Sequence, residues 1–222
     1  MRNHTASVKR SKCFWERTMN SPGFQSALLV LDLINEVVHP DGWYGRDGYA
    51  EQVRSRQVLH HAAQALGRAR AHGLPVIHVV VGFSESYAEC PTGSSVLSVA
   101  RQDRRLQLGT WATQPPPELA PRSTEPVVVK QRVSPFYQTN LELLLRAQRI
   151  EKLILIGVST EFVVLATAMD AHDRDYHVSV IEEATAALDP VRHDAAVKVL
   201  RSTADVTTLD GAFANAKFFK EI

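Results

Sequence analysis

Three positions in the sequence could do chemistry, and each follows a run of apolar residues. Asp32 lies within LVLDLIN, Lys130 ends VVVK, and residues 158–163 follow the apolar run LILIG. An unpaired carboxylate is costly to bury, so we expect Asp32 to pair with Lys130. Burial and mutual attraction would perturb the ionisation of such a pair, a condition suited to acid–base catalysis. The alternative is an ion pair that only fixes the geometry of the sheet.

The third position is the start of a predicted helix. If Ser159 or Thr160 caps this helix, residue 163 lies in its first turn, where free backbone N–H groups and the helix dipole favour an anion. A cysteine there, with Asp32 as proton acceptor, would be an activated nucleophile. The sequence has Val163 instead, which has no such chemistry.

Alternating strands and helices must hold these positions. Apolar runs predict strands at 27–33, 74–82, 125–130, 151–157 and 176–182, with a last strand near 204–209. Helical spacing or helix-start signals predict helices over 51–73, 139–148, 160–175 and 190–203, the last capped by Asp189. This order predicts an α/β protein, a three-layer α-β-α arrangement around a mostly parallel six-stranded sheet. Ligands of such sheets collect at the carboxyl ends of the strands, where all three positions fall.

Length and composition set outer bounds on organisation and partners. With 222 residues we expect one domain at 25–222, preceded by an arm at 1–24. The 25 basic and 24 acidic residues nearly cancel and form no long block, which gives no sign of nucleic acid or of an anionic membrane. No apolar run approaches the roughly 18 residues of a membrane helix. Cys13 and Cys90 lie far apart, which suits a reducing compartment and predicts a cytoplasmic protein.

Two segments have two readings each. The arm is either a frayed tail or a segment that docks on a neighbouring subunit through Phe14 and Trp15, and the tail is favoured. The Pro-rich stretch 83–126 is either a functional cover over the site or a loop that contains a helix.

Three segments together carry a resemblance to a known family. They are VLDLINEVV, KQRVSPFYQTNL and GVSTEFVVLATAMDA. Over roughly residues 25–210 the chain resembles the isochorismatase-like hydrolase family, also called the cysteine hydrolase family. The resemblance implies the family's fold and a homodimer or homotetramer. Family members hydrolyse small amides, ureas or related bonds with an Asp, a Lys and a Cys, beside an oxyanion site of backbone amides near a cis peptide bond.

Carried over by position, these roles fall on this chain with one failure. Asp32 takes the acid–base role, Lys130 the supporting cation, and the turn Val158, Ser159 and Thr160 the oxyanion site, with the cis bond between Val158 and Ser159. The nucleophile falls on Val163, so hydrolysis through a thioester is not implied. Glu161 replaces the asparagine that is usual after the motif's threonine.

Loss of the thiol need not end catalysis. Members that resemble isochorismatase itself also lack the cysteine and cleave a vinyl ether with the Asp as general acid, although the sequence around Val163 is more similar to the amide-cleaving branch. We therefore expect a hydrolase-like enzyme that acts on a small carbonyl- or carboxylate-bearing molecule by thiol-independent acid–base chemistry through Asp32 and Lys130. One alternative is a non-catalytic binding or structural homologue. Another is a nucleophile supplied by Glu161 or Cys90.

Further side chains near the motifs are candidates for lining the pocket, with core or subunit contacts as the alternative. They are Asn35, Trp43, Tyr44, Phe83, Phe136, Tyr137, Glu161 and Phe162. Nicotinamidase relatives add an Asp-x-His metal site, but here His39 and Asp41 come in the reverse order. We expect no metal and no cofactor.

Overall fold

The computed structural model describes residues 24–214 and has the predicted α/β architecture. The expected arm at 1–24 therefore lies almost wholly outside the described residues. Six strands form one sheet in the order β3-β2-β1-β4-β5-β6, and every pair of neighbours is parallel. Their bounds are β1 Ser26–Leu31, β2 Val76–Val81, β3 Val127–Lys130, β4 Lys152–Val158, β5 His177–Ala186 and β6 Asp205–Thr207.

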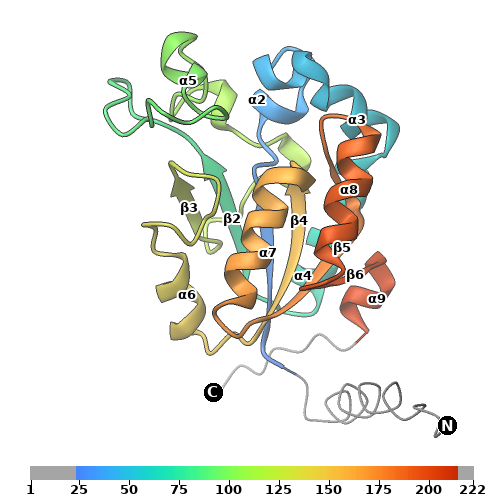
Figure 1. The fold of residues 1–222 in the computed structure, drawn as a ribbon. Coiled ribbons are helices and arrows are strands. Elements are labelled where there is room, and N and C mark those ends of the chain that lie inside the picture. Colours follow the sequence, from blue (N-terminus) through green and yellow to red (C-terminus); the bar gives the residue numbers. More distant parts are fainter. Residues whose placement is uncertain (1–23, 215–222) are drawn as a thin grey trace, which may run out of the picture.

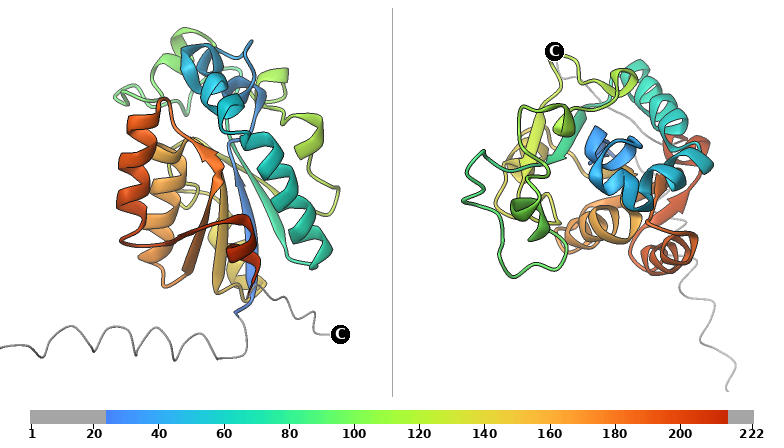
Figure 2. Two further views of the ribbon diagram at one scale, coloured as in Figure 1. Left: turned by 90° about the vertical axis from the view of Figure 1, so that its right-hand side faces the viewer. Right: turned by 90° about the horizontal axis from the view of Figure 1, so that it is seen from above.

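Helices cover both faces of this sheet, which gives three layers (Figures 1 and 2). One face packs against α3 Ala50–Ser55, α4 Val58–Ala71 and α9 Leu209–Phe213. The other packs against α6 Leu141–Ala147, α7 Leu165–His172 and α8 Pro190–Leu200. Two apolar cores result because alternate residues of each buried strand face opposite sides: Leu28 and Val30 point into one core, Leu29 and Leu31 into the other.

Short helices and loops gather above the carboxyl ends of the strands (Figure 1). They include α2 Asn35–Val38, η1 Gly45–Tyr49, α5 Val99–Gln102 and η4 Thr160–Val164, the last continuous with α7. The stretch 83–126, expected as a cover or as a loop with a hidden helix, contains α5 and the two short turns η2 Trp111–Thr113 and η3 Pro117–Leu119. None of the helices within residues 24–214 is long and apolar enough to cross a membrane.

Two boundaries differ from the predicted ones for backbone reasons. The predicted helix 51–73 is divided between α3 and α4 because Gln57 has a positive φ of 54°, which interrupts the helical path. Strand β1 ends at Leu31, and Asp32 follows it with a φ of 49°. The chain therefore turns at the carboxylate itself.

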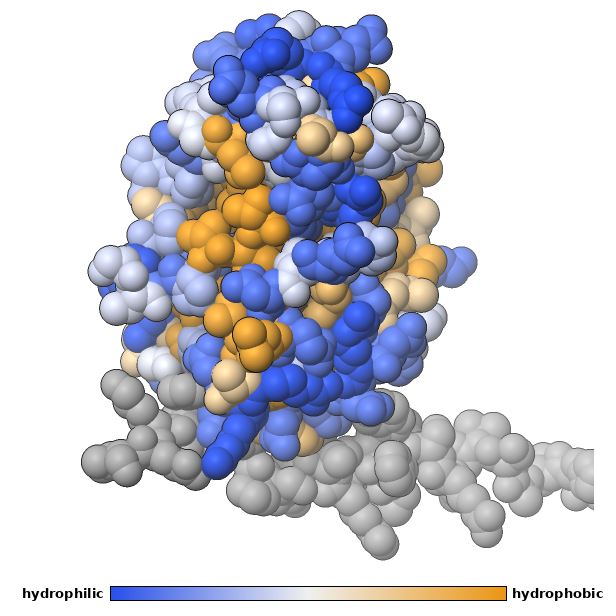
Figure 3. Space-filling view, turned by 90° about the vertical axis from the view of Figure 1, so that its left-hand side faces the viewer, coloured by the Kyte–Doolittle hydropathy of each residue, from blue (hydrophilic) through white to orange (hydrophobic). Residues whose placement is uncertain are grey.

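The edge of the sheet at β3 carries apolar surface. Figure 3 views this side of the molecule, which holds β3, α6 and the adjoining loops, and shows apolar side chains running across it. Val127 of β3 is 46% exposed and Leu143 of α6 is 70% exposed. An apolar face of this kind is typical of a surface that another protein covers.

Candidate active site

Asp32 and Lys130 meet above the central strands of the sheet. Strand β2 lies between the strands that carry them, and it contributes to the contact as well. Lys130 Nζ lies 2.8 Å from Asp32 Oδ2, and the backbone N–H of Val81 at the end of β2 donates to Oδ1 at 2.7 Å. Lys130 Nζ also donates to the carbonyl of Arg132 at 3.1 Å. Each oxygen of the carboxylate is thus held by one donor.

Burial dominates the electrostatics of this pair. Asp32 is 5% exposed and Lys130 is 2% exposed. Burial raises the pKa of Asp32 above its usual value, and the opposing effects of the Lys130 charge and of the hydrogen bonds from Lys130 and Val81 do not cancel it. A carboxyl group with a raised pKa can hold and release a proton closer to neutral pH, as a general acid or base requires.

The turn after β4 brings a helix start next to this pair. The peptide bond between Val158 and Ser159 is cis, at the position that the resemblance implies. Gly157 has a φ of 146°, and a Cβ built on it would lie 2.1 Å from the carbonyl oxygen of Leu31. Only glycine lets β4 approach β1 this closely where the two strands end. The first helical turn follows at Thr160, whose hydroxyl lies 3.0 Å from Nδ1 of the buried His193.

A cavity of about 460 Å³ opens between these groups and the covering loops. Its charged lining residues are Asp32, Asp47, Arg105, Lys130 and Arg192, and its uncharged polar ones are Tyr44, Tyr49, Ser95 and Ser159. The remaining lining is apolar: Val37, Val81, Val96, Leu97, Val99, Leu106, Val133, Val158, Phe162, Val163 and Leu188. A cavity of this size, mostly apolar with a few placed polar groups, suits a small organic molecule.

Comparison with known proteins identifies the family. The sequence model of the isochorismatase domain matches residues 26–211, which is nearly the whole described chain. The chain belongs to the isochorismatase family.

Several solved structures share the architecture of this chain. An isochorismatase family protein from Desulfovibrio vulgaris is 26% identical, with a TM-score of 0.73 over 86% of this chain and 99% of that one. N-carbamoylsarcosine amidase from Thermoplasma acidophilum is 29% identical, with a TM-score of 0.66 over 84% of this chain and 97% of that one. Nicotinamidase from Bacillus subtilis has a TM-score of 0.66 at 22% identity, over 82% and 99% of the two chains. The match to the last shows a shared fold.

Val163 occupies the first helical turn and lines the cavity together with Asp32 and Lys130. Its side chain is buried among the residues of one of the two cores. The equivalence of Val163 to the cysteine of isochorismatase-family hydrolases rests on the sequence resemblance and remains a prediction. At this place the cavity presents an aliphatic side chain.

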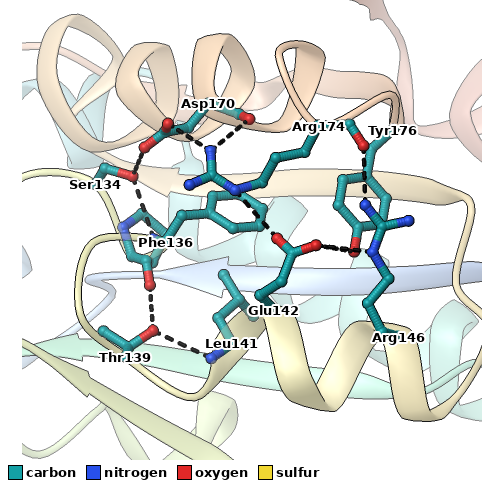
Figure 4. Close-up of polar contacts among 10 residues, drawn as sticks. Ser134, Phe136, Thr139, Leu141, Glu142, Arg146, Asp170, Arg174 and Tyr176 are labelled. Carbon is teal, nitrogen blue, oxygen red and sulfur yellow. Dashed lines mark hydrogen bonds and ion pairs between the residues drawn. The ribbon is translucent and has the colours of Figure 1, made fainter.

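The segment that follows Lys130 is held in place by a network of polar contacts (Figure 4). Ser134 donates to Asp170 of α7 and accepts from the N–H of Phe136 at 3.2 Å, while Thr139 accepts from the N–H of Leu141 at 3.1 Å. The Arg174 guanidinium lies 4.7 Å from the centroid of the Phe136 ring. Within the segment KQRVSPFYQTNL, these contacts of Ser134, Phe136, Thr139 and Leu141 thus fix the loop that leads from Lys130 into α6.

Of the predicted pocket residues, Tyr44 and Phe162 line the cavity. Asn35, Trp43, Phe83, Phe136, Tyr137 and Glu161 are not among its lining residues. Asn35 donates to the carbonyl of Trp111, and Phe83 and Phe136 are core residues. Trp43 and Tyr137 are 48% and 52% exposed. Glu161 lies behind the cavity wall and accepts a hydrogen bond from Tyr49, which does line the cavity.

Five polar lining residues were not predicted from the sequence: Asp47, Tyr49, Ser95, Arg105 and Arg192. Tyr49 ends η1, Arg105 lies in the long stretch after β2, and Arg192 lies in the first turn of α8. Arg105 contacts Asp103 and Asp47 and lies over the rings of Trp43 and Tyr44. The only signal in the sequence is that a ligand of a parallel sheet meets the loops after the strands.

Neither Cys90, considered above as a nucleophile, nor His39 and Asp41, considered for a metal site, line the cavity. Cys90 is buried in the core, is absent from the cavity lining, and its thiol lies 3.4 Å from the carbonyl of Leu97. Among residues 24–214 there is no group of three or more His, Cys, Asp or Glu side chains placed to hold a metal ion. His39 and Asp41 lie together at the exposed surface.

Proposed function

We propose that this member of the isochorismatase family is a hydrolase that acts on a small carbonyl- or carboxylate-bearing molecule without a thiol, through Asp32 and Lys130. The observation that carries the proposal is the 2.8 Å contact between Lys130 Nζ and Asp32 Oδ2 in the lining of a ligand-sized cavity. Val163 beside them supplies no nucleophile. The similar N-carbamoylsarcosine amidase supports hydrolysis as the reaction class.

The proposed chemistry moves one proton between Asp32 and the ligand. In its protonated form, which the raised pKa makes accessible, Asp32 donates a proton to an oxygen or carbon atom of the substrate. The Lys130 ammonium group then stabilises the carboxylate that remains, and a water molecule attacks the activated substrate. The scissile bond breaks, the leaving group keeps the proton that Asp32 donated, and the proton released by the water returns to Asp32. Val158, Phe162 and Val163 keep the reacting end of the cavity apolar, which strengthens these electrostatic contacts.

The test compares two carboxylates that line the same cavity. The protein is first incubated with small amides, ureas, esters and vinyl ethers, and products are detected by mass spectrometry. Asp32→Asn is then expected to reduce turnover by about 10²-fold or more, whereas Asp47→Asn changes it only a few-fold. Unchanged turnover in Asp32→Asn would contradict the proposal.

A second candidate function is ligand binding without catalysis, and Val163 is the observation that favours it. An aliphatic side chain in the first helical turn gives a closed apolar contact in place of a reactive group. Ligands that raise the melting temperature and are recovered chemically unchanged after long incubation would support this second candidate.

We also propose that the protein is a homodimer or homotetramer and that the apolar face at β3 and α6 is part of the contact. Light scattering after size exclusion gives the mass of the assembly. Leu143→Asp, in α6, is expected to lower this mass, while Val191→Asp, at a 79% exposed position of α8, leaves it unchanged. Equal masses for both variants would contradict the assignment of this face.

A further inference from the structure

Tyr49 and Ser159 form a second polar wall of the cavity, apart from Asp32 and Lys130. The Tyr49 hydroxyl donates to Glu161 Oε1 at 2.9 Å. Glu161 Oε1 also accepts from the backbone N–H of Leu188 at 3.0 Å. Tyr49, Ser159 and Leu188 all line the cavity. Glu161 therefore holds this wall from behind.

Ser159 has the position of a helix cap but does not act as one. It is the residue before η4, where a serine side chain ordinarily accepts from a free N–H of the first turn. Here its side chain makes no capping bond, and Ser159 lines the cavity beside Tyr49.

Glu161 fixes the direction of the hydrogen bond from Tyr49. A carboxylate only accepts, and Tyr49 has one hydroxyl proton, so this proton points to Glu161. The Tyr49 hydroxyl therefore has no proton left for a ligand and offers only its lone pairs. At Tyr49 the wall can accept a hydrogen bond from a ligand but cannot donate one.

The charges around the cavity also disfavour a negatively charged ligand. Each cation of the lining has a carboxylate partner: Lys130 pairs with Asp32, Arg105 with Asp103 and Asp47, and Arg192 with Asp189. Glu161 has no ion pair within residues 24–214, and its Oε2 atom is buried without a hydrogen-bond partner there. Burial raises the pKa of Tyr49, and the negative charge of Glu161 raises it further, as expected for a phenol hydroxyl in contact with a carboxylate.

We propose that Glu161 makes the cavity selective for ligands that present an uncharged hydrogen-bond donor, a hydroxyl or an N–H group, and makes it exclude carboxylates. This inference rests on the proposed function in taking the cavity as the ligand site, and it narrows the substrate to the uncharged carbonyl compounds. Tyr49 and Ser159 would touch the ligand. Glu161 acts through Tyr49 and is a positioning residue.

The test measures binding of three probes of similar size, benzyl alcohol, benzamide and benzoate, by calorimetry or ligand-observed NMR. In the wild-type protein both uncharged probes are expected to bind about tenfold more tightly than benzoate or better. Glu161→Gln removes the charge and can donate toward Tyr49, which frees the Tyr49 hydroxyl to donate to a ligand. In this variant the preference for the two uncharged probes over benzoate is therefore expected to fall by at least about fivefold.

Two further variants separate the mechanism from general damage to the cavity. Tyr49→Phe removes the acceptor oxygen from the wall while keeping Glu161, and is expected to weaken the preference as well. Glu36→Gln removes another buried carboxylate, one that lies near Arg105, and is expected to leave the preference unchanged. Circular dichroism and melting temperature establish that each variant is folded. If Glu161→Gln does not fold, Tyr49→Phe decides the outcome.

Three results would overturn the inference. They are benzoate binding to the wild type as tightly as benzyl alcohol, no binding of either uncharged probe up to its solubility limit, and a preference that is the same in wild type, Glu161→Gln and Tyr49→Phe. Because binding is measured without turnover, these results are independent of the Asp32→Asn experiment, which tests the proposed function.

Discussion

Lys130 Nζ lies 2.8 Å from Asp32 Oδ2 although the strands that carry the two residues are not neighbours in the sheet. The strand between them ends at Val81, whose N–H holds the other carboxylate oxygen. Three adjacent strand ends therefore share one buried carboxylate. Removing a single member of such a buried pair leaves an uncompensated charge.

Lys130→Met is accordingly expected to destabilise the fold by about 3–5 kcal/mol, because Asp32 remains buried without its partner. The double variant Asp32→Asn with Lys130→Met buries no charge and is expected to recover most of that loss. Urea unfolding followed by circular dichroism measures both. A double variant that is no more stable than Lys130→Met would show that the charge itself is not what costs stability.

Val163→Cys is expected to place a reactive thiol in the first turn of the helix. The free N–H groups and dipole there lower a thiol pKa, and the cavity gives reagents access. Iodoacetamide labelling at several pH values, mapped by mass spectrometry, compares the new thiol with the buried Cys90. Val164→Cys is the matched control, since Val164 is fully buried and is not among the cavity's lining residues. Equal labelling of both variants would show that position 163 has no special environment.

Glu125 is expected to make stability depend on pH in the acid range. Burial alone would raise its pKa, but hydrogen bonds from Arg70, the Arg122 N–H and His78 outweigh burial and lower the pKa to about 2, from 4.5. A lowered pKa in the folded state gives stability that is present above about pH 4.5 and is lost as the pH falls toward 2. Glu125→Gln should therefore cost about 2 kcal/mol at pH 7 and much less near pH 2. A cost that is constant over this range would contradict the assignment.

Two glycines give opposite expectations for the same substitution. Gly157→Ala would place a Cβ against the Leu31 carbonyl at a φ of 146°, and is expected to destabilise the fold by more than about 3 kcal/mol. Gly67→Ala, in α4, meets no atom within 4 Å and is expected to stabilise by about 0.5–1 kcal/mol. Thermal unfolding of the two variants measures the difference. Similar melting temperatures would mean that β4 can move away from β1 without cost.

The layered fold and the acid–amine pair follow from patterns that are local in the sequence. Each central strand is a short apolar run, and in a parallel sheet every such run delivers its last residue to the same edge. Asp32 and Lys130 could therefore be placed near each other without knowing the path of the chain between them. The resemblance to the isochorismatase family is confirmed by the match over residues 26–211.

The remaining wall of the cavity depends on contacts that no local pattern records. Tyr49 meets Glu161 across 112 positions of sequence, and the aromatic residues beside the motifs take quite different places. Trp43 and Tyr44 are neighbours in the sequence, yet Tyr44 lines the cavity while Trp43 is half exposed. Both residues lie just before η1, in a short helical stretch that is interrupted at Gly48, so no period runs long enough for the sequence to say which of two neighbours points inward.

Glu161 Oε1 ties three segments together, because it joins its own helix to Tyr49 before α3 and to Leu188 before α8. A ligand that pushes any one of these segments outward must break a bond shared by the other two. Outward movement of these three segments is therefore expected to be concerted, because all three share hydrogen bonds to one oxygen atom.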